Sequence, residues 1–103
     1  MHPNAWQELR VVGVEDGGFS RASSGRAVQK ALFVCVLMRG NWIEDFQVDK
    51  LMIDGLDASE KLVSMLRRWT FQAVMLGGVS FAGFNLVDPT LVFEEFSKPV
   101  VVI

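Results

Sequence analysis

Glu15 and Asp16 are the two acidic residues whose position best suits metal chemistry. They end a valine-rich segment and precede a glycine-rich one, VVGVEDGG, as carboxylates at the end of a strand would. Metal-assisted cleavage of a phosphodiester uses carboxylates to hold one or two divalent cations, and such hard cations prefer oxygen ligands. Glu15 and Asp16 are therefore the candidate catalytic and metal-binding residues, and magnesium or manganese is the candidate cofactor.

The acidic residues also have simpler interpretations. Adjacent residues on a strand point to opposite faces, so only one of Glu15 and Asp16 should enter a given site. An acidic strand end before a turn requires no metal at all. Asp54 precedes a glycine and is better interpreted as a turn residue, while Asp57 and Asp88 stand where helices should begin and are better interpreted as caps.

The glycine-containing segment 77–85, GGVSFAGFN, is a second candidate for chemistry. Its backbone amides could approach a phosphate, because glycines permit close contact. The segment matches neither a Walker loop nor a dinucleotide-binding fingerprint. The alternative is a tight connection between a strand and a helix.

Cys35 and His2 argue against several catalytic mechanisms. Cys35 is the only cysteine and lies in the apolar run ALFVCVLM, which predicts a buried core thiol rather than a nucleophile and leaves no partner for an intrachain disulfide. His2 is the only histidine and lies near a terminus, which argues against a histidine-based triad or a histidine-rich zinc site.

Composition favours a single cytoplasmic domain without membrane partners. Hydrophobic residues make up 50% of the chain, yet no apolar run reaches the ~20 residues of a bilayer-spanning helix, and no signal-peptide pattern is present. The net charge of −2 gives no overall basic footprint for nucleic acid. Arg21 and Arg26, in the Gly/Ser-rich loop 16–26, could contact a nucleic acid backbone or simply be solvated.

Hydrophobic periodicity predicts the elements that position these residues. Strands are expected over residues 9–15, 27–39, 42–53, 71–76 and 99–103, and helices over residues 57–69 and from residue 88. The pattern of 27–39 is nearly continuous and does not by itself exclude a helix. Gly40-Asn41 signals a hairpin. Asp57 and Glu60 resemble a capping box, and Pro89 suits the first position of a helix.

The expected order is therefore β-β-β-α-β-α-β, with an antiparallel meander followed by parallel strands. In the third strand, Phe46, Val48 and Met52 share one face, and Gln47 and Asp49 lie on the other, which predicts a strand with one side toward solvent. This is an α/β fold with a ribonuclease H-like mixed five-stranded sheet of order 3-2-1-4-5 and two helices.

Five sequence pieces in this order resemble a known family: VVGVEDGGFSR, MRG, MIDGLDASEKL, VMLGGVSFAGFNLVD and KPVVVI. The family is an archaeal domain of unknown function, numbered ninety-nine, whose members are similar to endonuclease V, a metal-dependent nuclease that cuts near deaminated purines. The resemblance covers nearly all of the chain. It implies that Glu15 or Asp16 provides the first metal-binding carboxylate, and that Gly77 stands where a later aspartate is expected. It also implies that Gly78 and Asn85 lie at the same substrate-binding rim.

The family continues at its C-terminus into further helices, so the resemblance implies that residues 1–103 form one endonuclease V-like domain without those helices. An uncovered apolar face then predicts a homo-oligomer. Glutamate at position 15 and glycine at position 77 depart from the endonuclease V pattern. Two functions stay open: a metal-dependent nucleic-acid-processing protein with a degenerate site, or a non-catalytic binding or interaction module on the same fold.

Overall fold

The structure, a computed structural model, describes residues 5–17 and 30–103. The predictions for His2, Arg21 and Arg26 lie outside the described residues. In chain order, the elements are a 3₁₀ helix over Ala5–Glu8, β1 (Arg10–Asp16), β2 (Lys30–Arg39), β3 (Trp42–Met52), α1 (Ala58–Leu66), β4 (Ala73–Leu76), β5 (Ser80–Phe81), β6 (Asn85–Leu86), α2 (Pro89–Phe96) and β7 (Val100–Val102).

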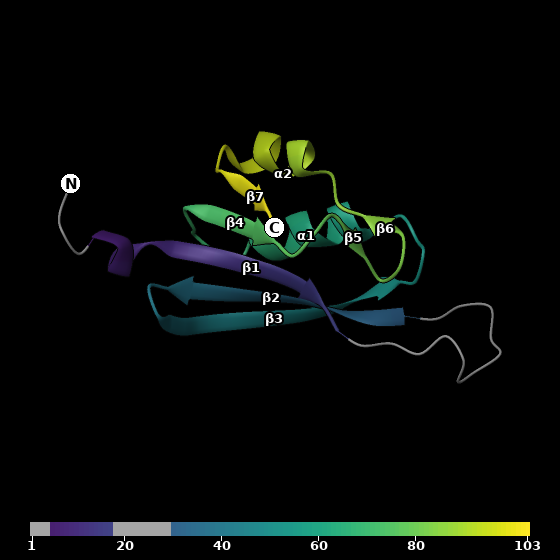
Figure 1. The fold of residues 1–103 in the computed structure, drawn as a ribbon, viewed down its shortest axis with the longest axis horizontal. Helices are drawn as coiled ribbons and strands as arrows, with labels where there is room; N and C mark the ends of the chain where they lie inside the picture. The colour runs from purple at the N-terminus through teal and green to yellow at the C-terminus, as the bar shows by residue number, and fades with distance from the viewer. Residues whose placement is uncertain (1–4, 18–29) are drawn as a thin grey trace.

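The main sheet has five strands in the order β3-β2-β1-β4-β7, which run from bottom to top in Figure 1. β1, β2 and β3 pair antiparallel, whereas β4 pairs parallel with both β1 and β7. The predicted order 3-2-1-4-5 is confirmed, with β7 as its fifth strand. The small hairpin of β5 and β6 was not predicted, because strands of two residues are too short to show a period.

One face of the sheet carries the core. Alternate residues of the strands, among them Val12, Phe33 and Leu51, are fully buried there against Leu62 and Leu66 of α1. The T-shaped pair of Phe33 and Phe81, with ring centroids 5.3 Å apart, attaches the β5–β6 hairpin to this core. No helix in the described part of the chain is long and apolar enough to span a bilayer.

The turn between β2 and β3 follows the prediction. Arg39 pairs with Trp42 across it, and Gly40 has a φ of +56°, in the region that favours glycine. The Cβ of any other residue at this position would also lie 3.0 Å from the backbone of Gln7. Glycine is therefore required at position 40 for two reasons, its positive φ and the close approach of the Gln7 backbone.

The two helix starts differ from each other. The Asp88 side chain accepts a hydrogen bond from the Thr90 N–H at 3.0 Å, with Pro89 in the first turn, which confirms the predicted cap of α2. The predicted capping box of α1 is wrong, because the Asp57 side chain makes no capping hydrogen bond. Asn85 replaces it: its Oδ1 accepts from the Ala58 N–H at 2.9 Å.

β3 has one side toward solvent, as predicted, but it is the apolar side. Phe46 and Val48 are 64% and 50% exposed, whereas Gln47 lies on the core side and donates from Nε2 to the Met65 carbonyl of α1 at 2.8 Å. The register with β2 fixes this arrangement, since Cys35, which is fully buried, pairs with Gln47. A period of two identifies the two faces of a strand but not which of them a helix covers.

Candidate functional site

Glu15 and Asp16 point to opposite faces of the sheet, as strand geometry requires. Asp16 lies on the side of the helices, where its Oδ2 accepts a hydrogen bond from the Ala82 N–H at 2.8 Å. Glu15 is exposed on the other side of the sheet, which neither α1 nor α2 covers. The expectation that only one of the two acids can serve a given site therefore fits the geometry, and Glu15 is the one whose carboxylate is exposed.

Gly77 is the immediate neighbour of Glu15 on the next strand. β1 and β4 pair in parallel up to Val14 and Leu76, and the Gly77 N–H continues the ladder by donating to the Val14 carbonyl at 3.1 Å. A Cβ built on Gly77 would lie 3.0 Å from Cδ of Glu15 and would overlap its Oε2. The two departures noted in the sequence are thus complementary, because the longer acid reaches into the space that the missing side chain leaves.

Glu15 stands at the edge of a shallow apolar depression of about 370 Å³ in the uncovered face. Glu15 is the only ionisable side chain among its lining residues, which are Gly13, Val14, Glu15, Val34, Val36, Met75, Gly77 and Ile103. The apolar lining can contact a carbon-rich group of a ligand. The Glu15 carboxylate can contact a polar or charged group of the same ligand.

The described residues do not by themselves fit a complete metal centre. Within 5–17 and 30–103, no group of three or more His, Cys, Asp or Glu residues is arranged to hold an ion. Gly77 contributes no side chain, and the Asp16 carboxylate is turned to the other face of the sheet. Glu15 can therefore supply one ligand to a cation, and any other ligands must come from outside this set.

Asn85 lies in the protein interior and is fully buried. Its Nδ2 donates to the Met52 carbonyl at 2.8 Å and to Oδ1 of Asp57 at 2.6 Å, and its Oδ1 caps α1 through Ala58. Both amide hydrogens are thus used in joining the end of β3 to the start of α1. This placement favours a structural role for Asn85 over the predicted contact with a substrate.

Backbone amides of the segment 77–85 donate hydrogen bonds to other parts of the protein. The N–H groups of Gly77, Ala82 and Phe84 donate to Val14, Asp16 and Asp54 respectively. These bonds favour the alternative of a tight connection over a phosphate-binding loop. Gly78 has a φ of +102°, and a Cβ at this position would meet no atom within 4 Å, so this glycine serves the turn that follows β4.

Asp54 is a turn residue, as predicted, with a φ of +56°. Its N–H donates to the Ala82 carbonyl at 2.8 Å, and its Oδ1 accepts from the Phe84 N–H at 2.9 Å. Both backbone polar groups of Ala82 are therefore hydrogen-bonded: its N–H donates to the Asp16 side chain, and its carbonyl accepts from the Asp54 N–H. Ala82, with a φ of +46°, is a structural residue that no feature of the sequence indicated.

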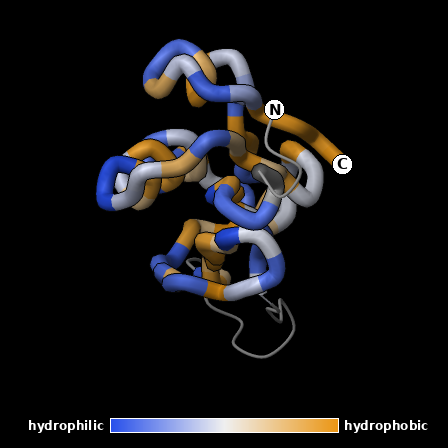
Figure 2. Tube along the Cα trace, turned by 90° about the vertical axis from the view of Figure 1, so that its left-hand side faces the viewer, coloured by the Kyte–Doolittle hydropathy of each residue, from blue (hydrophilic) through white to orange (hydrophobic). Residues whose placement is uncertain are grey.

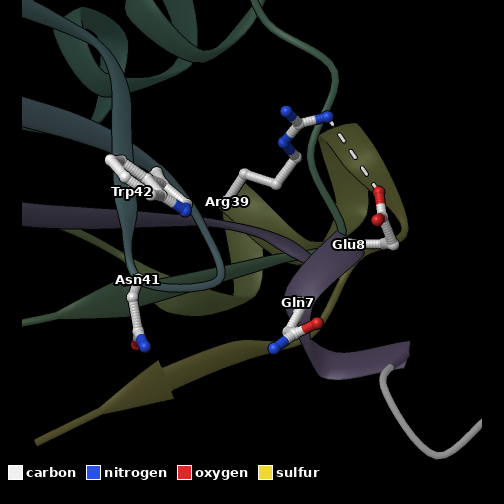
Figure 3. Close-up of a pocket in the computed structure, with 5 residues that line it drawn as sticks. All are labelled: Gln7, Glu8, Arg39, Asn41 and Trp42. Carbon is white, nitrogen blue, oxygen red and sulfur yellow. Dashed lines mark ion pairs between the residues drawn. The ribbon is translucent and has the colours of Figure 1, made fainter.

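A second pocket, of about 260 Å³, lies at the opposite end of β1 and is lined by Gln7, Glu8, Arg39, Asn41 and Trp42 (Figure 3). The Arg39 guanidinium lies 4.0 Å from a Glu8 oxygen and 3.8 Å from a Glu44 oxygen, so its charge is already shared between two acids. None of the predicted site residues lines this pocket.

Cys35 is fully buried in the core, which confirms its structural interpretation. Burial raises the pKa of the Cys35 thiol to about 12, because a thiolate would lose its hydration there. The thiol is therefore protonated at neutral pH and is not a nucleophile.

A family model, described as endonuclease dU, matches residues 7–103. The chain belongs to the endonuclease dU family. The resemblance inferred from the five sequence pieces is confirmed, since the curated relatives are uncharacterised archaeal proteins of the UPF0215 family. The protein of Pyrococcus horikoshii is 35% identical over 101 residues, covering 94% of this chain and 51% of its own length. The protein of Archaeoglobus fulgidus is 37% identical, with the same coverage of 94% and 51%.

The endonuclease dU family fold is also present in a solved structure. A protein of unknown function from Archaeoglobus fulgidus aligns with a TM-score of 0.78 and 35% identity, over 92% of this chain and 53% of that one. This chain therefore spans about half the length of the relatives it matches.

Proposed function

We propose that this chain is a nucleic-acid-processing domain of the endonuclease class, and that Glu15 is its catalytic carboxylate. The observation that carries the proposal is the complementarity of Glu15 and Gly77, because it leaves an exposed carboxylate at the junction of β1 and β4 with room around it. The family description, endonuclease dU, supports the reaction class and DNA that contains deoxyuridine as the first substrate to test.

In this proposal Glu15 would supply one oxygen ligand to a magnesium or manganese ion, the type of cation that polarises a phosphodiester. The described residues offer no second and third carboxylate beside it, so further ligands such as the substrate phosphate would be needed. The depression beside Glu15 gives one side of the exposed carboxylate an apolar surrounding. Asp16 acts only by positioning the β5–β6 hairpin through Ala82.

A second candidate function, a non-catalytic module that binds nucleic acid or protein, is favoured by one specific observation. Gly77 stands where the resemblance places an aspartate, and no cluster of three potential metal ligands exists within residues 5–17 and 30–103. A fold that keeps its sheet but supplies one carboxylate can still bind a partner without cleaving it.

The two candidates are separated by a cleavage assay on labelled single- and double-stranded DNA with one deoxyuridine, in Mg²⁺ or Mn²⁺. The catalytic proposal expects cleavage by the wild type, a loss of about 100-fold or more in Glu15→Gln, and no loss in the matched control Glu60→Gln, an exposed acid of α1. DNA binding without cleavage by the wild type, unchanged in Glu15→Gln, would establish the non-catalytic module instead.

A further inference from the structure

The pocket at the start of β1 brings an aromatic ring, a guanidinium group and two carboxamides to one place. It lies where the 3₁₀ helix meets the β2–β3 turn, and the Gly40 N–H joins these segments by donating to the Leu9 carbonyl at 3.1 Å. Figure 2 views the molecule from this end, where the turns nearest the viewer are mainly hydrophilic to neutral. With a volume of about 260 Å³, the pocket suits one small polar ligand rather than an apolar protein segment.

Trp42 presents its indole ring to solvent beside this pocket. The residue is 77% exposed, and among the described residues no other ring packs on it and no group accepts from its indole N–H. Aromatic side chains bind unpaired nucleobases by stacking, and this contact tolerates every base because each has a π-face. Trp42 is therefore suited to hold the flat face of a base.

The carboxamides of Gln7 and Asn41 line the same pocket and are labelled in Figure 3. Neither makes a hydrogen bond to the described part of the chain. A carboxamide carries a donor and an acceptor side by side, the pattern that matches the edge of a base such as adenine. Gly40 lets the turn approach the Gln7 backbone closely, which keeps both carboxamides at one pocket.

Arg39 provides a positive charge whose ion pairs are long. Its guanidinium lies 4.0 Å from a Glu8 oxygen and 3.8 Å from a Glu44 oxygen, both beyond hydrogen-bond distance. The same Glu44 oxygen lies 2.8 Å from Nε of Arg10, which is its closer partner. Because long ion pairs at exposed positions contribute little, a phosphate can replace them with shorter bonds to the guanidinium.

We propose that this pocket binds an unpaired nucleobase together with its phosphate. The base stacks on Trp42 and bonds through its edge to Gln7 and Asn41. The phosphate binds the Arg39 guanidinium. A base inside a duplex cannot bind in this way, because its faces and its pairing edge are occupied, so the ligand is a free nucleotide or a base of a single strand. Glu15 lies at the far end of β1, and the binding therefore needs neither divalent metal nor the proposed cleavage.

The test measures binding in EDTA, with AMP and adenosine by titration calorimetry and with a labelled oligodeoxyadenylate of about eight nucleotides by fluorescence anisotropy. We expect saturable binding of AMP and about tenfold weaker binding of adenosine, which lacks the phosphate. An oligonucleotide that binds at least about tenfold more tightly than AMP identifies a single strand as the source of the base, and equal affinities identify a free nucleotide. Absence of saturable binding at millimolar AMP and micromolar oligonucleotide would overturn the proposal, as would equal affinity for the matching duplex.

Trp42→Leu removes the aromatic face but keeps apolar bulk. It should weaken the binding of AMP and of the oligonucleotide about tenfold or more and leave the melting temperature unchanged, whereas Trp42→Phe should keep most of the affinity. The matched control is Phe93→Ala, which removes a ring that is 52% exposed on α2, outside the pocket, and should leave the affinity unchanged. Equal affinity of Trp42→Leu and wild type would overturn the stacking.

Arg39→Gln tests the contact with the phosphate separately. It should weaken AMP about tenfold and leave adenosine unchanged, because only the phosphate loses its partner. Lys50→Gln, which removes one positive charge near the other end of β3, is the matched control and should alter neither. An equal loss of AMP and adenosine binding in Arg39→Gln would overturn the assignment of the phosphate to Arg39. Glu15→Gln should bind both probes as wild type does, which separates this site from the proposed cleavage.

Discussion

The Glu15 carboxylate occupies the space in which a side chain on Gly77 would begin. The overlap involves the far end of a flexible side chain rather than backbone, so a methyl group at position 77 can be accommodated if Glu15 rotates away. The backbone of Gly77, unlike that of Gly78, does not lie in the left-handed region. Glycine at position 77 is therefore needed to leave space for the Glu15 side chain rather than to allow an unusual backbone conformation.

Gly77→Ala is accordingly expected to change stability little and to displace Glu15. We expect its free energy of unfolding to stay within about 0.5 kcal/mol of wild type, as for other exposed substitutions. Under the catalytic proposal, cleavage of deoxyuridine-containing DNA should fall as far as it does in Glu15→Gln, because the carboxylate no longer occupies its wild-type position. Urea denaturation and the cleavage assay give the two measurements.

Gly78→Ala is the matched control for this prediction. With a φ of +102° and no atom near the position that its Cβ would take, it should lose about 1 kcal/mol or more through backbone strain alone. Cleavage by the folded variant should be unchanged. If Gly77→Ala proved the less stable of the two, the complementarity of Glu15 and Gly77 would not be the reason for glycine at position 77.

Asn85→Ala should be among the most destabilising single substitutions in the chain. It removes the acceptor that caps α1 and the donor that Asn85 supplies to the Met52 carbonyl and the Asp57 carboxylate, and of these the Met52 carbonyl still accepts from the Gly55 N–H. Loss of a cap and of two further, partly buried hydrogen bonds predicts a cost of about 2–4 kcal/mol in chemical denaturation.

Asp88→Ala provides the comparison for Asn85→Ala, since it removes a single exposed cap bond, to Thr90, and should cost about 1 kcal/mol. Equal costs for the two variants would mean that the Asn85 bonds contribute little beyond capping.

The pattern of apolar residues predicted the five strands of the main sheet and both helices, because each element buries one face and repeats with its own period. The same pattern could not identify which face of β3 is covered. Polarity alone would bury Phe46 and expose Gln47, whereas the pairing of Gln47 with the buried Cys35 places Gln47 on the covered side. That decision depends on contacts distant in sequence. On the covered side, Gln47 donates from Nε2 to the Met65 carbonyl of α1.

The candidate site was predictable only as far as local sequence specifies it. Alternation along β1 separates Glu15 from Asp16, and this separation was expected. The exchange of roles between Asp57 and Asn85 was not, because Asn85 caps a helix that begins 27 residues earlier. The closeness of Glu15 and Gly77 depends on the register of a parallel pair of strands, which no turn between them fixes.

Cys35 should resist modification until the protein unfolds. Its thiol is fully buried, and its pKa of about 12 leaves almost no thiolate at about pH 8. A thiol reagent such as DTNB should therefore react with the native chain only at the rate of unfolding and at once in denaturing urea. Rapid reaction of the native chain would show that the strand β2 opens locally.

Asp49 should contribute to the loss of stability in acid. The Lys50 N–H, which donates to Asp49 Oδ1 at 2.7 Å, and then the Lys61 ammonium at 3.2 Å hold the pKa of Asp49 below its ordinary value. A carboxyl group with a lowered pKa stabilises the fold above its unfolded pKa of about 3.9, and this contribution is lost as the pH falls through the folded pKa. Because the side chain is 44% exposed, the effect is small.

Asp49→Asn should therefore lower the urea midpoint slightly at about pH 7 and make the midpoint fall less steeply below about pH 4 than in wild type. Glu94→Gln, a change at an exposed acid of α2, is the control and should leave the slope unaltered. The same acid slope for wild type and Asp49→Asn would show that the bonds from Lys50 and Lys61 do not persist in solution. A slope that Glu94→Gln flattens as much would assign the effect to overall charge instead.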